Sequence, residues 1–262
     1  LLRGITFVEV LVLAVAGFGM FFLFAIARPL WPWDTTPFNA AFLGATYIAS
    51  FAATLTLVLL SKWSVARMIL RMLLVFTLVV LIVSVFNLSQ FHFDRWASWA
   101  WFALYILLPL NAAYHLWLYR KLPPAQSVGT PQLWRAYLMA QGIVLGLYAL
   151  ALFMVPDLFI AFWPWPVDVF HAQMYSAIGF TAAIASFSLT WVASRDEFMA
   201  LGLTQIALGL FALLGTLIVN NVSVVKKHVD FSVGGTWLWL GVNLWLFLMG
   251  IAMLVRWQRS SD

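Results

Sequence analysis

The chain has 262 residues, of which 65% are hydrophobic and 9% are charged, and it contains no cysteine. A soluble domain carries charge on about a quarter of its residues, so this composition excludes a soluble globular fold and predicts a chain that folds in lipid. The net charge of +5 comes from single or paired basic residues at the ends of apolar stretches. That pattern orients membrane spans and excludes a nucleic-acid-binding surface.

Eight apolar stretches are each long enough to cross a membrane as an α-helix. A hydrocarbon core of about 30 Å requires roughly 20 helical residues. Continuous apolar character, without alternation, favours helices over transmembrane strands. The sequence therefore predicts an all-α integral membrane protein. The predicted spans are 4–27, 38–60, 65–86, 97–119, 133–155, 169–193, 198–219 and 236–255.

The basic residues predict the orientation of these spans. Because the number of predicted spans is even, both termini lie on the same side of the membrane. Arg28, Arg95, Lys226 and Lys227 fall on the other side, and all remaining Lys and Arg residues fall on the terminal side. The positive-inside rule therefore predicts that both termini are cytoplasmic.

The same residue pattern occurs twice, at a constant offset of 132 residues. The pairs are Arg3 and Arg135, Glu9 and Gln141, Trp31 and Trp163, Pro32 and Pro164, Trp33 and Trp165, and Phe38 and Phe170. Repetition of this kind predicts a duplicated membrane unit. We expect a first four-helix repeat over 1–120, a Pro-rich cytoplasmic linker over 121–132 and a second repeat over 133–262. Repeats with an even number of spans are parallel, around a pseudo-two-fold axis along the membrane normal.

A Trp-Pro-Trp loop ends the first helix of each predicted repeat. The loop residues are Trp31, Pro32, Trp33 and Asp34 in the first copy, and Trp163, Pro164, Trp165 and Asp168 in the second. Tryptophan prefers the membrane interface, and proline ends a helix. One interpretation is a rigid cap that directs the next helix back into the membrane. The other is an outer-face docking surface for a ligand or another subunit, since rigid aromatic side chains are common anchors.

Two His-x-Asp triplets precede the last predicted span of each repeat. His92 and Asp94 precede the fourth span, and His228 and Asp230 precede the eighth, at an offset of 136. Imidazole and carboxylate groups ligate zinc, manganese or copper, and two-fold symmetry would bring the two pairs towards one centre. The alternative is ordinary capping and salt-bridge residues.

Polar side chains also fall within the predicted spans. Glu9 in the first span matches Gln141 in the fifth, and Asn111 and His115 lie near the cytoplasmic end of the fourth. A carboxylate within a span is costly unless it is paired, protonated or facing a polar cavity. One interpretation is a proton or cation relay through Glu9 and His115. The other is a structural hydrogen bond between helices, or an ion pair with Arg3.

Charged residues mark the inner ends of the third and seventh spans. Arg67 and Arg71 lie one helical turn apart, where they could bind anionic lipid headgroups or a cytoplasmic partner, or simply extend to the interface. Asp196 and Glu197 follow Arg195 and predict a solvated turn with an acidic start to the next helix.

The run Trp-Pro-Trp-Asp-Thr-Thr-Pro at 31–37, with Ala-Phe-Leu-Gly-Ala at 41–45 and Trp-Ser-Val-Ala-Arg at 63–67, resembles a group of uncharacterised bacterial multi-pass membrane proteins. The resemblance covers this one stretch and a weaker echo in the second half, where Val169 replaces Pro37 and Met199 replaces Arg67. It implies a bacterial inner membrane location. It implies no activity, cofactor or site residue.

The sequence contains no H-E-x-x-H helix, G-x-S-x-G elbow or P-loop, so an enzyme is not predicted. We expect a non-catalytic multi-pass subunit or scaffold of a larger membrane assembly, with the lipid bilayer and other membrane subunits as its partners. The alternative is a small ion, proton or solute transporter or channel, with a pathway between the repeats lined by the four intramembrane polar residues. A third possibility is a metal or redox enzyme at the outer His/Asp set. No cofactor is predicted.

Overall fold

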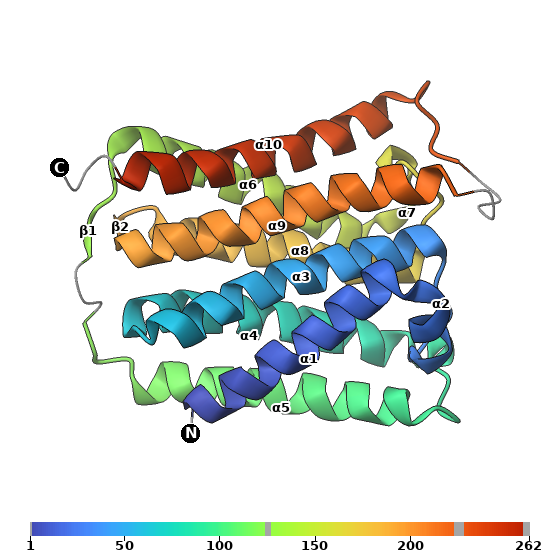
Figure 1. Cartoon of the computed structure of the whole chain (residues 1–262), viewed down its shortest axis with the longest axis horizontal. Helices are drawn as coiled ribbons and strands as arrows, with labels where there is room; N and C mark the ends of the chain where they lie inside the picture. Colours follow the sequence, from blue (N-terminus) through green and yellow to red (C-terminus); the bar gives the residue numbers. More distant parts are fainter. Residues whose placement is uncertain (1, 124–126, 223–227, 259–262) are drawn as a thin grey trace. The chain divides into compact units, whose positions relative to one another are not determined.

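A computed structural model of the chain describes residues 2–123, 127–222 and 228–258, with side chains described for 4–123, 127–222 and 228–255 (Figure 1). The long helices are α1 (Leu2–Phe22), α3 (Pro37–Leu60), α4 (Trp63–Phe86), α5 (Trp96–Leu118), α6 (Gln132–Met154), α8 (Val169–Leu189), α9 (Arg195–Asn220) and α10 (Gly234–Gln258). The short elements are α2 (Phe24–Ala27), η1 (Arg28–Leu30), η2 (Leu88–Gln90), β1 (Val128–Gly129), α7 (Pro156–Phe159), η3 (Ile160–Phe162) and β2 (Val192–Ala193). Lys226 and Lys227, which the orientation prediction uses, lie outside the described residues, and so does the side chain of Arg3.

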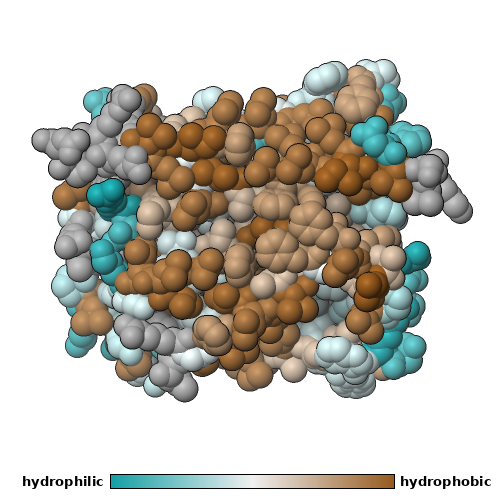
Figure 2. Space-filling view, viewed as in Figure 1, coloured by the Kyte–Doolittle hydropathy of each residue, from teal (hydrophilic) through white to brown (hydrophobic). Residues whose placement is uncertain are grey.

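Seven of the long helices in the described part of the chain are long and apolar enough to cross a membrane. Hydrophobic residues cover the visible middle stretches of the helices, and hydrophilic residues gather near helix ends (Figure 2). The predicted all-α membrane class agrees with these observations. The sixth predicted span corresponds to α8, which is not among the seven. Its first half contains the polar residues His171, Gln173 and Ser176.

The first predicted span is shorter than expected, because α1 ends at Phe22 and not at Ala27. Leu23 leaves helical geometry, with φ −119° and ψ 36°, and the chain re-forms the short helix α2 before η1. The second half of the chain repeats this break at Val155, with φ −137° and ψ 55°, before α7 and η3. There Pro156 follows the break, and proline disfavours helical geometry in the residue before it.

The helices form two compact units. Unit 1 consists of Leu1–Leu59, Asp157–Asp168 and Met199–Asp262, and unit 2 of Leu60–Pro156 and Val169–Phe198. Each unit therefore combines two long helices from the first half of the sequence with two from the second half. Unit 1 contains α1, α3, α9 and α10, whereas unit 2 contains α4, α5, α6 and α8. The compact units thus differ from the predicted repeats 1–120 and 133–262, which remain a prediction about how the sequence is organised.

In unit 1, small residues allow close contact between helices in the order α1, α3, α9, α10. At Gly44 of α3, a Cβ atom would lie 2.7 Å from the backbone nitrogen of Phe21 in α1. Ile48 and Ala49 of α3 pack with Ala207 of α9 in a buried apolar cluster. Farther along α9, a Cβ atom on Gly209 would lie 2.4 Å from a backbone oxygen of α10. Small residues at such contacts are the usual means by which helices pack in membranes.

Unit 2 has the matching order α6, α8, α4, α5, in which each helix packs against the next. Gly179 of α8 faces Ala149 of α6, where a Cβ atom would lie 2.8 Å from the Ala149 side chain. The Trp101 indole of α5 donates a hydrogen bond of 3.0 Å to the Ser84 hydroxyl of α4. Helix α8 therefore lies between two apolar long helices, and neighbours on both sides shield its polar residues.

The first prediction concerns the contact between α9 and α10. Gly209→Ala should lower the free energy of unfolding by about 1–3 kcal/mol, because the new methyl group would collide with the backbone carbonyl of Asn243. Gly241→Ala in α10 is the matched control, since nothing lies within 4 Å of its Cβ position. Unfolding in detergent micelles measures both variants. Equal stability of the two variants would show that α9 and α10 do not approach this closely.

Candidate functional site

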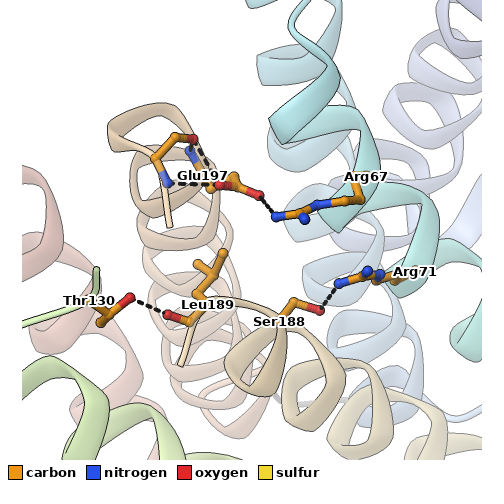
Figure 3. A network of polar contacts seen from close by, with 7 residues as sticks. Arg67, Arg71, Thr130, Ser188, Leu189 and Glu197 are labelled. Atoms are coloured by element: carbon orange, nitrogen blue, oxygen red, sulfur yellow. Dashed lines mark hydrogen bonds and ion pairs between the residues drawn. The ribbon is translucent and has the colours of Figure 1, made fainter. Parts of the chain in front are cut away.

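The densest set of charged side chains in unit 2 lies where α8 ends and α9 begins, opposite the first turns of α4 (Figure 3). The start of α9 is a capping box. Ser194 is the residue before the helix, and its hydroxyl accepts the backbone N–H of Glu197 at 3.3 Å. The Glu197 carboxylate accepts the backbone N–H of Ser194 at 2.8 Å in return. Two otherwise unbonded backbone donors are satisfied in this way.

The second oxygen of the Glu197 carboxylate bonds to α4. Arg67 Nη2 donates to Glu197 Oε1 at 3.2 Å. The Glu197 side chain is 0% exposed and the Arg67 side chain is 20% exposed. A buried carboxylate is strongly destabilising unless a positive charge and hydrogen-bond donors accompany it, and Arg67 and Ser194 supply both.

Two further polar contacts continue along α4. Lys62 Nζ lies 2.6 Å from Asp196 Oδ2 in a pair that is partly open to solvent, with side chains 46% and 15% exposed. Deeper in α4, Arg71 Nη1 donates to the hydroxyl of Ser188 at 3.3 Å. The carboxylates of Asp196 and Glu197 therefore neutralise two of the three cations. The third, Arg71, has a neutral hydrogen-bond partner.

The same end of α4 carries buried polar atoms that have no hydrogen-bond partner within the described residues. They are the hydroxyl of Ser64, Nε of Arg67 and Nε1 of Trp63. Ser64, Arg67 and Arg71 are spaced three and four residues apart, so they share one face of α4. Each of these atoms can donate a hydrogen bond. This end of α4 therefore has hydrogen-bond donors that the described residues do not use.

The end of the predicted linker is attached beside this network. β1 pairs with β2 through Val128 and Ala193. The Thr130 hydroxyl donates to the carbonyl of Leu189 at 2.6 Å, which satisfies one of the free carbonyls at the end of α8 (Figure 3). The Arg135 guanidinium lies 4.9 Å from the ring centre of Trp191, at cation–π distance. Contacts from β1, Thr130 and Arg135 thus hold the α8–α9 connection in place.

The structure corrects one prediction at this site. Glu197 does not lie in a solvated turn, because it is fully buried and bonded to Arg67. The pattern Ser-x-x-Glu at 194–197 is a capping-box signature that could have been recognised in the sequence. No comparable local signal points to the Arg67–Glu197 pair, whose members lie 130 residues apart.

The Trp-Pro-Trp loops lie inside unit 1. Trp33, Trp163 and Trp165 are buried, and Trp31 is half-buried. Trp165 stacks on Phe38 with ring centres 5.3 Å apart. Because these rings pack against α3 and against each other, the contacts favour the rigid-cap interpretation over the outer-face docking surface. Pro32 and Pro164 are also buried, whereas Asp34 and Asp168 are exposed.

The second loop also makes a polar contact with α3. The Trp165 indole donates to Asn39 Oδ1 at 2.9 Å, and both residues are buried. Phe42 lies within 5.9 Å of the Trp163, Trp165 and Trp239 rings, measured between ring centres. A buried indole needs a partner for its N–H, and Asn39 provides one. These contacts favour a rigid cap over a platform for a ligand.

The two His-x-Asp triplets do not occupy equivalent positions. The Ser98 hydroxyl donates to the His92 carbonyl at 2.7 Å, and the Thr236 hydroxyl donates to the Asp230 carbonyl at the same distance. His92 therefore corresponds to Asp230, at an offset of 138, and not to His228 at the predicted offset of 136. The apparent duplication of the triplet is a coincidence of sequence.

The His and Asp side chains of the triplets have other contacts. The Ser232 hydroxyl and backbone N–H donate to Asp230 Oδ1, and these two hydrogen bonds lower the pKa of Asp230. Nδ1 of His228 donates to the carbonyl of Asn220 at 2.8 Å. Within the described residues, no three His, Asp or Glu side chains come together as metal ligands would. The predicted metal centre formed by His92, Asp94, His228 and Asp230 therefore has no support in this geometry.

The predicted intramembrane polar residues are divided between the units. Glu9 lies in unit 1, and Gln141, Asn111 and His115 lie in unit 2. Gln141 Nε2 donates to the Ser186 hydroxyl at 2.8 Å, and its Oε1 accepts a hydrogen bond from Tyr137. The Gln141–Ser186 hydrogen bond joins α6 to α8, as the structural interpretation of Gln141 expects. The buried His115 bonds through Nδ1 to the Asn111 carbonyl one turn earlier in α5, at 2.9 Å.

No protein-family model matches the chain, and no curated protein or solved structure matches it. The fold and the site define it only as a helical protein with candidate membrane spans.

The second prediction tests the buried ion pair. Glu197→Gln should lower the free energy of unfolding by about 3 kcal/mol, because Arg67 loses its counter-charge in a buried setting. The double variant Arg67→Met, Glu197→Gln should lose less, since neither charge remains. Asp196→Asn is the control, and breaking its partly exposed pair with Lys62 should cost at most about 1 kcal/mol. Unfolding in micelles measures the variants. An equal loss of unfolding free energy in Glu197→Gln and Asp196→Asn would show that the buried Arg67–Glu197 pair does not form.

The third prediction tests the structural role of the second Trp-Pro-Trp loop. Trp165→Ala should destabilise the protein by about 3–5 kcal/mol, because it leaves a cavity and an unbonded Asn39. Trp237→Ala is the control within unit 1. Its indole is exposed and bonds to the carbonyl of Phe231, so its loss should cost about 1 kcal/mol. Thermal unfolding in micelles compares the two, and a stable Trp165→Ala protein would restore the docking interpretation.

Proposed function

We propose that the protein is a non-catalytic multi-pass subunit or scaffold of a larger membrane assembly. The observation that carries the proposal is the use of buried polar side chains as ties between secondary-structure elements. Gln141–Ser186 joins α6 to α8, Trp101–Ser84 joins α5 to α4, and Trp165–Asn39 fixes a loop to α3. Polar groups used in this way stabilise a helical bundle, which is the role that a scaffold requires.

The exposed faces of the outer helices support the same proposal. Large apolar side chains project from α1 and α10, including Phe7, Val15, Trp237 and Trp245. Such surfaces are stable only against lipid tails or against the helices of another membrane protein. The lipid bilayer and other membrane subunits are therefore the proposed partners.

The proposal includes eight membrane spans, with α8 as the eighth. Helix α8 has 21 residues, which extend over about 32 Å and so match the hydrocarbon thickness. It packs against α6 and α4, two helices apolar enough to span the membrane. Polar residues are tolerated in a span when they face the bundle interior, and His171 and Ser176 are buried. With eight spans, the distribution of basic residues favours cytoplasmic termini in a bacterial inner membrane.

The proposal also includes the origin of the chain by duplication of a four-helix unit. Four pairs of elements begin 132 residues apart: α2 and α7, η1 and η3, α3 and α8, and α4 and α9. The packing order α1, α3, α9, α10 becomes α6, α8, α4, α5 when each helix is exchanged for its counterpart in the other half of the sequence. Duplication explains why both units contain two helices from each half, arranged in the same order.

The fourth prediction tests the scaffold proposal. Native mass spectrometry of the protein, extracted gently from its own membrane, should show a second membrane protein at a fixed stoichiometry. The ratio should be the same after extraction in two different mild detergents, because a specific interface does not depend on the detergent. An absorption spectrum of the same sample detects any pigment carried by the assembly.

A monomer or homodimer without a second protein would contradict the scaffold proposal. The discriminating measurement is then ion flux into proteoliposomes, with Glu9→Gln as the variant. Flux that depends on Glu9 would establish the transport alternative in its place.

A further inference from the structure

Three basic side chains but only two carboxylates meet at the start of α4 in unit 2. The Lys62–Asp196 and Arg67–Glu197 pairs are each neutral overall. Arg71 adds one positive charge, and the Ser188 hydroxyl that accepts its hydrogen bond at 3.3 Å is neutral. The described network therefore carries an excess of one positive charge.

The position of Arg71 along α4 makes this excess significant. Arg71 lies eight residues after Trp63, the first residue of the helix, which corresponds to about 12 Å along the helix axis. An arginine at this depth in a membrane span is costly unless it reaches the interface or meets an anion. The Arg71 side chain is half-buried, and in Figure 3 it extends from α4 towards the end of α8.

Unused hydrogen-bond donors lie on the same face of α4. Ser64 is 1% exposed, and its hydroxyl has no partner within the described residues. Nε of Arg67 is likewise buried without a partner there, although Nη2 of the same guanidinium bonds Glu197. The residue before the helix, Lys62, makes no side-chain cap, so the first backbone N–H groups of α4 add positive potential at this end.

These features together match the requirements of a phosphate group. Guanidinium groups bind phosphate oxygens with two parallel hydrogen bonds, and a serine hydroxyl adds a third donor. One excess positive charge corresponds to the single negative charge of a phosphodiester. Trp63, with its unbonded indole N–H at the helix start, is the residue type that favours the headgroup level of a membrane.

We propose that Ser64, Arg67 and Arg71 form a binding site for one phosphate group at the N-terminal end of α4. The group is carried by an acidic phospholipid headgroup or is a free phosphate ion. Both sources share the same chemistry, and the experiment distinguishes them. The site would bind one anion between α4 and the α8–α9 connection, and so strengthen unit 2 where three basic side chains share two carboxylates.

The fifth prediction is a lipid titration followed by native mass spectrometry of the full chain in mild detergent. Phosphatidylglycerol should bind at least about tenfold more tightly than phosphatidylcholine, whose headgroup has no net charge. Arg71→Gln should weaken phosphatidylglycerol binding by about tenfold, the effect of losing a charge-assisted hydrogen bond. Arg120→Gln is the matched control, because Arg120 is exposed and bonds the carbonyl of Trp117 outside the network. Its phosphatidylglycerol affinity should equal that of the wild type.

Ser64→Ala is the second variant, and it keeps the test decisive if Arg71→Gln does not fold. Removal of the unbonded hydroxyl should leave the unfolding temperature unchanged and weaken phosphatidylglycerol binding by about fivefold. Titration with inorganic phosphate identifies the source of the group. Displacement of the lipid by millimolar phosphate would support a free phosphate ion, and resistance to displacement would support the lipid. Wild-type affinity in both Arg71→Gln and Ser64→Ala would overturn the site.

Discussion

The structure depends on how helices can hold together when their backbone polar groups are already bonded within each helix. In lipid, an apolar side chain gains little by leaving one apolar surface for another. Contact must therefore come from close packing and from a few polar ties. Gly44 and Gly209 bring backbones into contact in unit 1, and Gly179 does so in unit 2. Hydrogen bonds such as Gln141–Ser186 then select one register among several that would pack equally well.

The same constraint explains why most hydroxyl groups bond within their own helix. Thr46, Thr54, Thr56, Thr77, Thr181 and Thr216 each donate to the carbonyl four residues earlier. A hydroxyl satisfied in this way carries no exposed polarity into lipid or into the core. The N-terminal end of α4 differs from these threonines, because Ser64 and Arg67 retain buried donors without a partner in the described residues, as Ser127 and Arg135 do elsewhere in unit 2.

The sequence predicts the elements well because length and apolar character are local properties. The predicted span 38–60 differs from α3 by one residue at its start, and 133–155 is shifted by one residue relative to α6. Contacts between helices are harder to predict from the sequence, because they join residues far apart in the chain. Arg67 was recognised as a charged residue at a helix end, but its partner Glu197 belongs to a different helix. The Trp-Pro-Trp loops are predicted at the end of the first helix of each repeat, but α2 and η1, and α7 and η3, lie between that helix and the loop. The burial of the second loop depends on Phe42 and Trp239, which belong to distant helices.

The proposed duplication relates the charged positions of α4 to those of α9. Helices α4 and α9 are equivalent under the offset of 132, so Val65 corresponds to Glu197 and Arg67 to Met199. If the second copy had the same residues as the first at both positions, two arginines would lie at equivalent helix starts without a carboxylate, because valine would replace Glu197. The copies differ instead in complementary ways, since the basic residue occurs in the first and the acidic residue in the second. The ion pair therefore requires both copies, and neither repeat could form it alone.

The same divergence restricts the proposed phosphate site to one copy. At the positions of α9 that correspond to Ser64, Arg67 and Arg71, the chain has Asp196, Met199 and Leu203. An aspartate repels phosphate, and neither Met nor Leu donates a hydrogen bond. A two-fold symmetric ancestor would present two equivalent helix starts, but this chain uses one to supply the anionic partner and the other to supply the donors. Under the proposed duplication, the two units share one packing order, but the charged helix starts of α4 and α9 are not equivalent.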